Sequence, residues 1–361
     1  MKIGLIGLNQ TGKTTLFNLL TGRSEVDAAA GGKGATNVGT CFVPDERVDF
    51  LSAIYKPKKT TFAKIEITDI AGLSISDGGR NSGASKFLND VRQCDVLIHV
   101  LRAFESGSVS HDLGDIDPAR DFEAVELEMQ FADLEMIERR IGRINSGKKI
   151  TREHEEELKL LDRCFKWLEN SSAIKDMELS PDELMLIRGY GFLTEKPCLA
   201  VVNLDEKQWN AKDWPNKGGL LKQCASLNIP VLELCVETEL EISRLPDDDK
   251  GLFMEDMGIT EPGIDALAKA SYDLLGFISF ITVGADEVRA WTIEKGTTAR
   301  SAAGKVHSDI ERGFIRAEVV KFESMRDLGS MVKVKEKGLF RLEGKDYIVV
   351  DGDVILFRFN V

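Results

Sequence analysis

Residues 7–14 read Gly-Leu-Asn-Gln-Thr-Gly-Lys-Thr, and this octapeptide constrains the fold more than any other stretch of the chain. It matches G-x-x-x-x-G-K-[ST] at every fixed position and lies between a short apolar run, residues 2–6, and a helix predicted at 14–20. A glycine-rich turn between a strand and a helix points backbone N–H groups inward, where the helix dipole adds positive potential. The octapeptide therefore predicts a phosphate-binding loop in an α/β fold. A chance glycine turn is the alternative, and the order of strand, loop and helix argues against it.

The side chains of this loop match the chemistry of a nucleoside polyphosphate. Lys13 supplies an ammonium for the β- and γ-phosphates, and Thr14 offers a hydroxyl to Mg²⁺, a cation that prefers oxygen ligands. We therefore predict a magnesium-dependent nucleotide site, with Lys13 also acting in catalysis. The nucleotide-binding residues predicted in the loop are Asn9, Gln10, Thr11, Gly12, Lys13, Thr14 and Thr15.

Four further stretches predict strands. Residues 62–69 alternate between apolar and polar side chains, whereas residues 95–101, 198–203 and 229–234 are nearly continuous apolar runs, which suits strands covered on both faces. Helical stretches separate these strands. The predicted fold class is therefore α/β, with a mostly parallel core sheet.

The strand at 62–69 ends in Asp69-Ile70-Ala71-Gly72, a D-x-x-G sequence. Its carboxylate can hold magnesium through water, and the Gly72 N–H can approach a γ-phosphate without a side-chain clash. A turn-forming Asp is the usual explanation of D-x-x-G alone, but downstream of a phosphate loop it indicates the sensing strand of a triphosphate switch. Residues 73–86 are rich in glycine and serine, so we expect them to reorder when the terminal phosphate leaves.

Residues 203–206 read Asn-Leu-Asp-Glu after the next long apolar strand. A guanine-selective switch protein has N-K-x-D here, so Leu204 and Glu206 replace the lysine and the aspartate. We predict that Asn203 bonds a purine edge and that Glu206 weakens guanine selection; an Asn that merely ends the strand is the alternative. Cys235, after the last strand, is a further candidate of the base-side loop.

The residue that activates water is less evident. Many regulatory NTPases place a glutamine directly after D-x-x-G, whereas this chain has Leu73, which cannot bond a water molecule. Hydrolysis then needs another group or a partner. His111, at the end of a loop over residues 104–111, is the best candidate, although a loop histidine is usually only exposed to solvent.

Outside the α/β layer the pattern changes twice. Between 121 and 170, apolar residues at 3–4 spacing surround a turn at 145–149, which predicts an antiparallel helical arm inserted over about 121–190. Surface helices packed on the sheet are the alternative. From about residue 277, β-branched and aromatic residues alternate with turn signals, and Asp351-Gly352 between two apolar runs predicts a hairpin. We therefore expect domains at 1–276 and 277–361.

Composition excludes several classes of protein. The chain has 361 residues and a net charge of −13, so nucleic acid is repelled at long range and any RNA contact needs a local basic patch. Residues 277–361 carry 14 Lys and Arg against 13 Asp and Glu, which makes them the candidate for that contact. No apolar run is long enough to cross a membrane, and the six scattered cysteines suit buried thiols in a reducing compartment. We expect a soluble, cytoplasmic protein without a membrane partner.

Together these motifs resemble the YchF/Obg-like ATPase family, a branch of the TRAFAC P-loop proteins. The resemblance spans nearly the whole chain, and residues 277–361 are similar to the family's TGS module, a ubiquitin-like β-grasp domain. It implies a P-loop NTPase with a Ras-like, OBG-type G domain, an inserted helical arm and a C-terminal TGS domain. The most specific segments are residues 69–73, 203–206, 287–292, 304–307, 313–319 and 344–361.

The resemblance also implies a function: slow hydrolysis of ATP, which is bound in preference to GTP, and association with ribosomes in translation and stress responses. It places Asn203 at the adenine edge, lines the base with the Leu204 region and puts the family's proposed catalytic histidine at His111. The family's switch I threonine aligns with Lys33, which leaves Thr36 as the nearby substitute for a second magnesium ligand. A nucleotide-bound scaffold with little turnover, which holds RNA or protein, is the alternative function.

Overall fold

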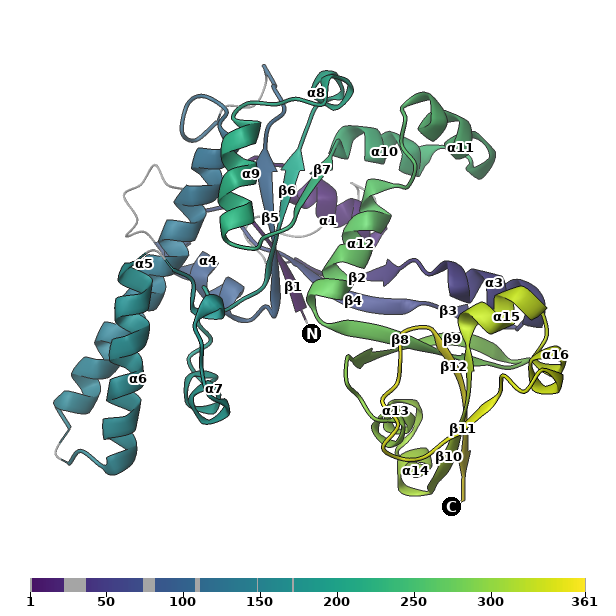
Figure 1. Cartoon of the computed structure of the whole chain (residues 1–361). Coiled ribbons are helices and arrows are strands. Elements are labelled where there is room, and N and C mark those ends of the chain that lie inside the picture. The colour runs from purple at the N-terminus through teal and green to yellow at the C-terminus, as the bar shows by residue number, and fades with distance from the viewer. Residues whose placement is uncertain are drawn as a thin grey trace. The chain divides into compact units, whose positions relative to one another are not determined.

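The computed structural model describes residues 2–22, 37–73, 82–107, 111–147, 149–170 and 172–360. They divide into two compact units, each described here by itself (Figure 1). Unit 1 comprises Met1–Gly39 and Glu66–Ile264, and unit 2 comprises Thr40–Ile65 and Asp265–Val361. Residues 40–65 therefore group with the C-terminal part of the chain, which the linear order of the sequence does not reveal. The predicted domain boundary at 276/277 stays a prediction.

Unit 1 is built on a six-stranded sheet of order β2-β4-β1-β5-β6-β7, and β1 pairs in parallel with both β4 and β5. The pairs β5–β6 and β6–β7 are also parallel, as the apolar runs predicted. The strands are β1 (Lys2–Ile6), β2 (Asn37–Val43), β4 (Ala63–Asp69), β5 (Val96–Arg102), β6 (Cys198–Asn203) and β7 (Val231–Leu234). The helices of this part of the chain are α1 (Lys13–Thr21), α4 (Ser82–Arg92), α5 (Pro118–Asn145), α6 (Arg152–Glu169), η1 (Ile174–Asp176), α7 (Pro181–Ile187), α8 (Glu206–Ala211), α9 (Lys217–Ser226), α10 (Val236–Arg244) and α11 (Asp247–Asp256).

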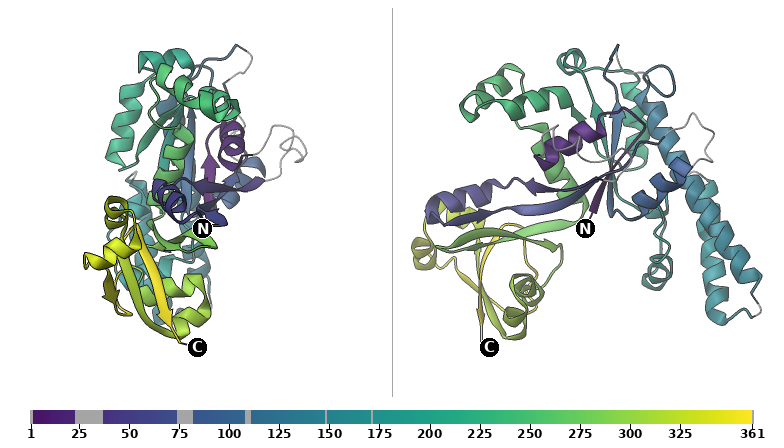
Figure 2. Two further views of the ribbon diagram at one scale, coloured as in Figure 1. Left: turned by 90° about the vertical axis from the view of Figure 1, so that its right-hand side faces the viewer. Right: turned by 180° about the vertical axis from the view of Figure 1, so that it is seen from behind.

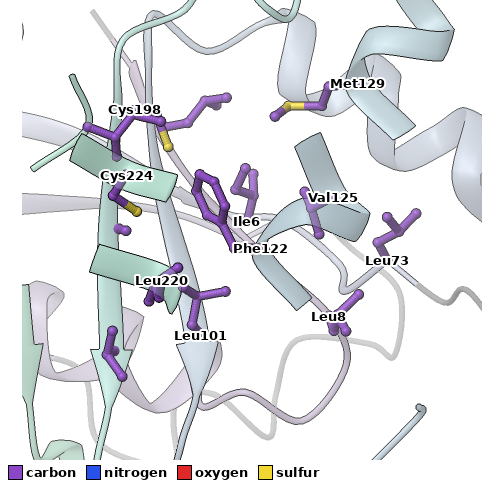
Figure 3. Close-up of a cluster of buried hydrophobic side chains, with 14 of the residues drawn as sticks. Ile6, Leu8, Leu73, Leu101, Phe122, Val125, Met129, Cys198, Leu220 and Cys224 are labelled. Carbon is purple, nitrogen blue, oxygen red and sulfur yellow. The ribbon is translucent and has the colours of Figure 1, made fainter. Parts of the chain in front are cut away.

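The core of unit 1 lies between the sheet and the first half of α5. Figure 3 shows Phe122, Val125 and Met129 of this helix beside Leu8 and Leu73 in one buried cluster. The helix starts sharply, because the Asp117 carboxylate caps two backbone N–H groups and Pro118 occupies the first turn. These three residues belong to the apolar spacing that predicted the arm, but they cover the sheet, so the alternative of surface helices holds for this half of α5.

The predicted arm is formed by the second half of α5 and by α6, which lie side by side in Figures 1 and 2. Its buried seam includes Ile137, Ile144, Leu161 and Leu168. Buried Asp133 fastens the arm's base, since its carboxylate accepts hydrogen bonds from the backbone N–H groups of Leu193 (3.0 Å) and Thr194 (2.9 Å). The inserted helical arm is thus confirmed, with its apolar seam starting later than predicted.

Unit 2 has a six-stranded sheet of order β11-β10-β12-β8-β9-β3, in which β12 lies parallel to β8 and antiparallel to β10. If β3 is left aside, the last strand, β12, lies beside the first strand, β8, and β8 pairs on its other edge with the second strand, β9. This is the strand order of a β-grasp domain, and it confirms the predicted C-terminal fold. The strands are β3 (Lys59–Thr61), β8 (Phe277–Val283), β9 (Glu287–Glu294), β10 (Phe314–Lys321), β11 (Arg341–Glu343) and β12 (Asp353–Phe359). The helices are α3 (Glu46–Tyr55), α12 (Gly263–Leu274, which begins in unit 1), α13 (Ala299–Val306), α14 (Ser308–Arg312), α15 (Phe322–Leu328) and α16 (Met331–Glu336).

Residues 40–65 join this domain through β3, which pairs in parallel with β9, and through Arg47 of α3. The Arg47 guanidinium bonds Asp351 at 2.6 Å and Asp45 at 2.8 Å, and these two carboxylates raise its pKa. The pairing and the ion pairs explain why a segment 200 residues upstream belongs to unit 2.

The hairpin predicted at Asp351-Gly352 is wrong, although the turn itself forms, with Gly352 at φ 81°. The following strand, β12, lies between β8 and β10, so neither of its edges is available to the preceding run. The preceding residues are held instead by the loop before α13, where the Val349 N–H donates to the Thr297 carbonyl at 3.0 Å.

All six cysteines are buried and free, as predicted. Among the described residues, no helix combines the length and the apolarity needed to span a bilayer.

Candidate functional site

The predicted site residues converge at the carboxyl edge of the sheet in unit 1. The phosphate loop follows β1, Asp69 ends β4, the segment before His111 leaves β5, and Asn203 ends β6. The crevice outside the carboxyl ends of a parallel sheet is where open α/β folds bind ligands.

The backbone of the loop requires its glycines. Gly7, Gln10 and Gly12 all have positive φ, at 137°, 60° and 96°. A Cβ at Gly7 would lie 2.4 Å from the Val100 carbonyl oxygen, and one at Gly12 would lie 2.4 Å from Asn203 Nδ2. The loop therefore packs directly on β5 and β6, and α1 begins immediately after it at Lys13.

The Lys13 side chain folds back over this loop. Its ammonium donates to the carbonyls of Leu8 and Gly7, the latter at 3.3 Å, and the side chain is buried. Burial lowers its pKa from 10.5 to about 8, against the attraction of Asp69 and Asp112. A buried ammonium held by neutral carbonyls is a strong partner for phosphate oxygens, which add the negative charge that the loop lacks.

Two of the three predicted magnesium ligands, Thr14 and Asp69, are in contact. Thr14 Oγ1 donates to Asp69 Oδ2 at 3.0 Å, and burial raises the pKa of Asp69 although Thr14, Lys13 and Asn37 lower it. One hydroxyl and one carboxylate, without nitrogen or sulfur, fit a hard cation that keeps several waters. No cluster of three His, Cys, Asp or Glu suited to a metal occurs among the described residues, so a cation here would depend on phosphate and water ligands as well. Thr36 lies outside the described residues, as do residues 74–81 of the predicted switch.

The D-x-x-G turn touches the phosphate loop through Asn9. A Cβ at Gly72 would lie 2.4 Å from Asn9 Oδ1 and 2.8 Å from its Cα, so only glycine fits here. The Asn9 amide also donates to Asp112 at 2.9 Å. Asn9 therefore joins the turn after β4 to the residue that follows His111. Gln10, Thr14 and Thr15 are exposed on the loop and at the start of α1, whereas Thr11 is buried.

Leu73 is a core residue at this edge of the sheet. Its N–H donates to the Gly7 carbonyl at 3.0 Å, and its side chain lies in the buried cluster with Leu8, Phe122 and Val125 (Figure 3). The leucine that replaces the usual glutamine is thus a core residue that ties the D-x-x-G turn to the phosphate loop.

His111 is buried rather than exposed. Its side chain is 3% exposed, Nε2 lies 2.7 Å from Asp121 Oδ2, and the Leu113 N–H donates to Nδ1 at 3.1 Å. Asp121 comes from the first turn of α5. Neither Asp121 nor Asp112 was predicted from the sequence. Only proximity to His111 along the chain could have suggested them, and many other acidic residues are as near.

The four base-side candidates differ in their surroundings. Asn203 is buried, and its amide donates to the Thr11 carbonyl (3.1 Å) and accepts from the Val236 N–H (3.2 Å). Leu204 and Cys235 are buried as well, and Leu204 belongs to the core cluster. Glu206 is exposed at the start of α8. Asn203 therefore links the phosphate loop to the start of α10, which follows β7. Of the four candidate side chains, only that of Glu206 is exposed to solvent.

This parallel sheet, its glycine-dependent loop and the joined Lys13, Thr14 and Asp69 define a P-loop NTPase. Residues 2–132 match the family model described as "50S ribosome-binding GTPase", and residues 277–360 match YchF-GTPase_C, described as "Protein of unknown function (DUF933)". The chain is 39% identical to the Ribosome-binding ATPase YchF of Bacillus subtilis (strain 168) and 40% identical to that of Haemophilus ducreyi, over 99% or more of each chain. A solved structure, the Schizosaccharomyces pombe YchF GTPase, superposes with a TM-score of 0.85 at 25% identity, covering 99% of this chain and 97% of that one. The chain belongs to the YchF family.

Proposed function

We propose that this protein is a magnesium-dependent ATP hydrolase that acts slowly as a nucleotide-switched regulator at the ribosome in the cytoplasm. One observation carries the proposal: the buried Lys13 ammonium bonds the backbone of a loop shaped by Gly7 and Gly12, and Thr14, the next residue, bonds Asp69. The relatives named above as ribosome-binding ATPases support the choice of nucleotide and partner.

Magnesium would be held by Thr14 Oγ1 directly and by the Asp69 carboxylate through water, with Thr36 as a further ligand. The cation would neutralise charge on the β- and γ-phosphates. Lys13 and the N–H groups of the loop would bind the same phosphates, and His111 would take the proton of the attacking water.

The first test is the affinity for ATP and GTP in the presence of magnesium, measured by calorimetry. Lys13→Ala should abolish tight binding, because it removes the charge that faces the phosphates from within the loop. Lys222→Ala, on the exposed face of α9, is the matched control and should bind as the wild type does. An unchanged affinity of the Lys13 variant would defeat the assignment of the site.

Base preference is tested at Glu206. We propose that its longer carboxylate, in place of the aspartate of N-K-x-D, disfavours guanine. Glu206→Asp should then raise the affinity for GTP relative to ATP by about tenfold, the effect of a single good hydrogen bond to a charged group. Because Leu204 is buried in the core, introducing a lysine there would disturb folding and is not a useful partner mutation. A fixed ratio of the two affinities would show that Glu206 does not read the base.

The second candidate function is a nucleotide-bound scaffold with little turnover. The burial of Leu73 favours it, since the position that usually orients the attacking water holds a core side chain. Single-turnover phosphate release at saturating ATP separates the two functions. Release no faster than without protein would favour the scaffold.

Ribosome association is proposed to involve unit 2 and the helical arm. Lys333, Lys335 and Lys337 are exposed at α16 and the residue after it, in the part of the chain with the least negative charge. Reversing all three to Glu should weaken co-sedimentation with ribosomes and reduce its dependence on salt, because fewer phosphate contacts remain. Exposed Lys207 and Lys222 of unit 1, reversed together, provide the charge-reversal control.

A further inference from the structure

The hydrogen bonds of His111 define one neutral form of its ring. The Leu113 N–H donates to Nδ1, so Nδ1 carries no proton in this arrangement, and Nε2 carries the hydrogen that it donates to Asp121. Both side chains are nearly inaccessible, at 3% for His111 and 1% for Asp121. In this neutral form Nδ1 is the nitrogen that can accept a proton, and in this structure it accepts from the Leu113 N–H.

The Asp121 carboxylate is itself fixed in place. It lies in the first turn of α5, and its second oxygen accepts from Arg120 Nη2 at 3.0 Å and Nε at 3.2 Å. Arg120 continues to Asp115 at 2.7 Å. Burial raises the pKa of Asp121, against the opposing attraction of Arg120 and His111, and Asp121 in turn acts on the buried Arg102 of β5.

The residue that follows His111 contacts the phosphate loop. Asp112, the neighbouring residue, accepts a hydrogen bond from Asn9 of the phosphate loop and acts electrostatically on Lys13. The contacts therefore form a connected path from α5 through Asp121 and residues 111–112 to the loop. A fixed carboxylate bonds one ring nitrogen and a backbone N–H donates to the other, so two hydrogen bonds set the orientation of the ring.

We propose that Asp121 is a positioning residue for hydrolysis, which holds His111 through Nε2 and leaves Nδ1 to accept the proton of the attacking water. The inference rests on the proposed function. Before the step, the attacking water replaces the Leu113 N–H as the donor to Nδ1. The water oxygen then forms a bond to the γ-phosphorus while its proton passes to Nδ1. The bond from phosphorus to the leaving oxygen breaks, and its electron pair remains on ADP.

The test is single-turnover phosphate release from ATP, followed against pH, for the wild type and two variants. His111→Ala should slow release about 10²-fold, the lower end of what a positioned base contributes. Asp121→Asn keeps an acceptor for the Nε2 hydrogen but loses the charge that stabilises the imidazolium. It should slow release about tenfold and change the pH profile of release, because the negative charge beside the ring is removed. The other charged groups around the ring, Arg102, Arg120, Asp112, Asp115 and Lys13, are the same in both proteins.

Three controls make the outcome specific. Asp115→Asn alters the same Arg120 network on an exposed side chain and should leave the profile unchanged. Asp121→Glu should restore part of the rate and of the profile. In a His111→Ala background, Asp121→Asn should have no further effect, because the carboxylate acts only through the ring.

The outcomes separate this inference from the proposed function. The inference is overturned if Asp121→Asn leaves the pH profile unchanged, or if it slows release as much in the His111→Ala background as in the wild type. It is also overturned if Asp121→Asn accelerates release, because the contact would then hold His111 back from catalysis. In all three cases His111→Ala would still be slow and the proposed function would stand. If the wild type itself releases no phosphate, or His111→Ala is as fast as the wild type, the assigned catalysis fails and this inference fails with it.

Discussion

The buried charge of Lys13 favours nucleotide binding but lowers the stability of the nucleotide-free protein. The residue is 6% exposed, and burial lowers its pKa from 10.5 to about 8. A difference of this size between the unfolded and folded states corresponds to a cost of about 3 kcal/mol in the free energy of folding while the lysine is charged. Phosphate would relieve that cost by pairing the charge.

Lys13→Met keeps the length and the apolar part of the side chain and removes its charge. We expect the nucleotide-free variant to be more stable than the wild type by about 1–2 kcal/mol at pH 7, because the lost hydrogen bonds to Gly7 and Leu8 offset part of the gain at about 1 kcal/mol each. Adding ATP with magnesium should stabilise the wild type and leave the variant unchanged.

The pH dependence has a definite sign. Below pH 8 the lysine is charged in both states, so its full cost is present. Between pH 8 and 10.5 the unfolded chain still binds the proton that folded Lys13 has lost, so the stability of the wild type rises with pH relative to the variant. The gap between the two proteins should therefore narrow over this range.

Urea unfolding followed by circular dichroism at pH 7, 8, 9 and 10 measures both effects. Lys222→Met, on the exposed face of α9, is the control for removing a charge at the surface. A Lys13 variant less stable than the wild type at pH 7, or a gap that stays constant to pH 10, would refute the reasoning.

Three further predictions concern single contacts. Gly72→Ala should slow single-turnover phosphate release about 10²-fold, because its Cβ would lie 2.8 Å from the Cα of Asn9 and displace the loop; normal release would contradict this close approach. Thr14→Val should lower the magnesium-dependent part of the ATP affinity about tenfold, whereas Thr14→Ser keeps the hydroxyl and should bind normally. Asp133→Ala leaves buried donors of Leu193 and Thr194 unpaired and should reduce stability by about 3 kcal/mol, seen as a lower melting temperature; an unchanged value would show that the arm's base is held by other contacts.

Much of the candidate site could be predicted because its signals are local. The spacing of Gly7, Gly12, Lys13 and Thr14 belongs to one turn, and Asp69 ends a strand whose alternation is visible in the chain. Parallel pairing then brings Thr14 and Asp69 together without further information, since the carboxyl ends of neighbouring parallel strands share an edge.

Contacts that depend on packing were not predictable. The burial of His111 follows from its carboxylate partner on α5, and that of Leu204 follows from its place in the core cluster. The motif of Asn203 predicts a contact with the purine edge, but it does not reveal the hydrogen bonds of its amide to the backbone of Thr11 and Val236. In each case the partner lies at a distance along the chain that local pattern does not encode.

The sequence by itself determined the phosphate loop, the parallel strands and the helical arm, because turn chemistry and hydrophobic periodicity act over a few residues. Tertiary structure alone decided which half of α5 covers the sheet, that residues 40–65 join the C-terminal domain, and that β12 lies between β8 and β10 rather than in a hairpin. These outcomes depend on which apolar faces and strand edges remain available for pairing. That depends in turn on segments far apart in the sequence, which compete for the same partner when the chain folds.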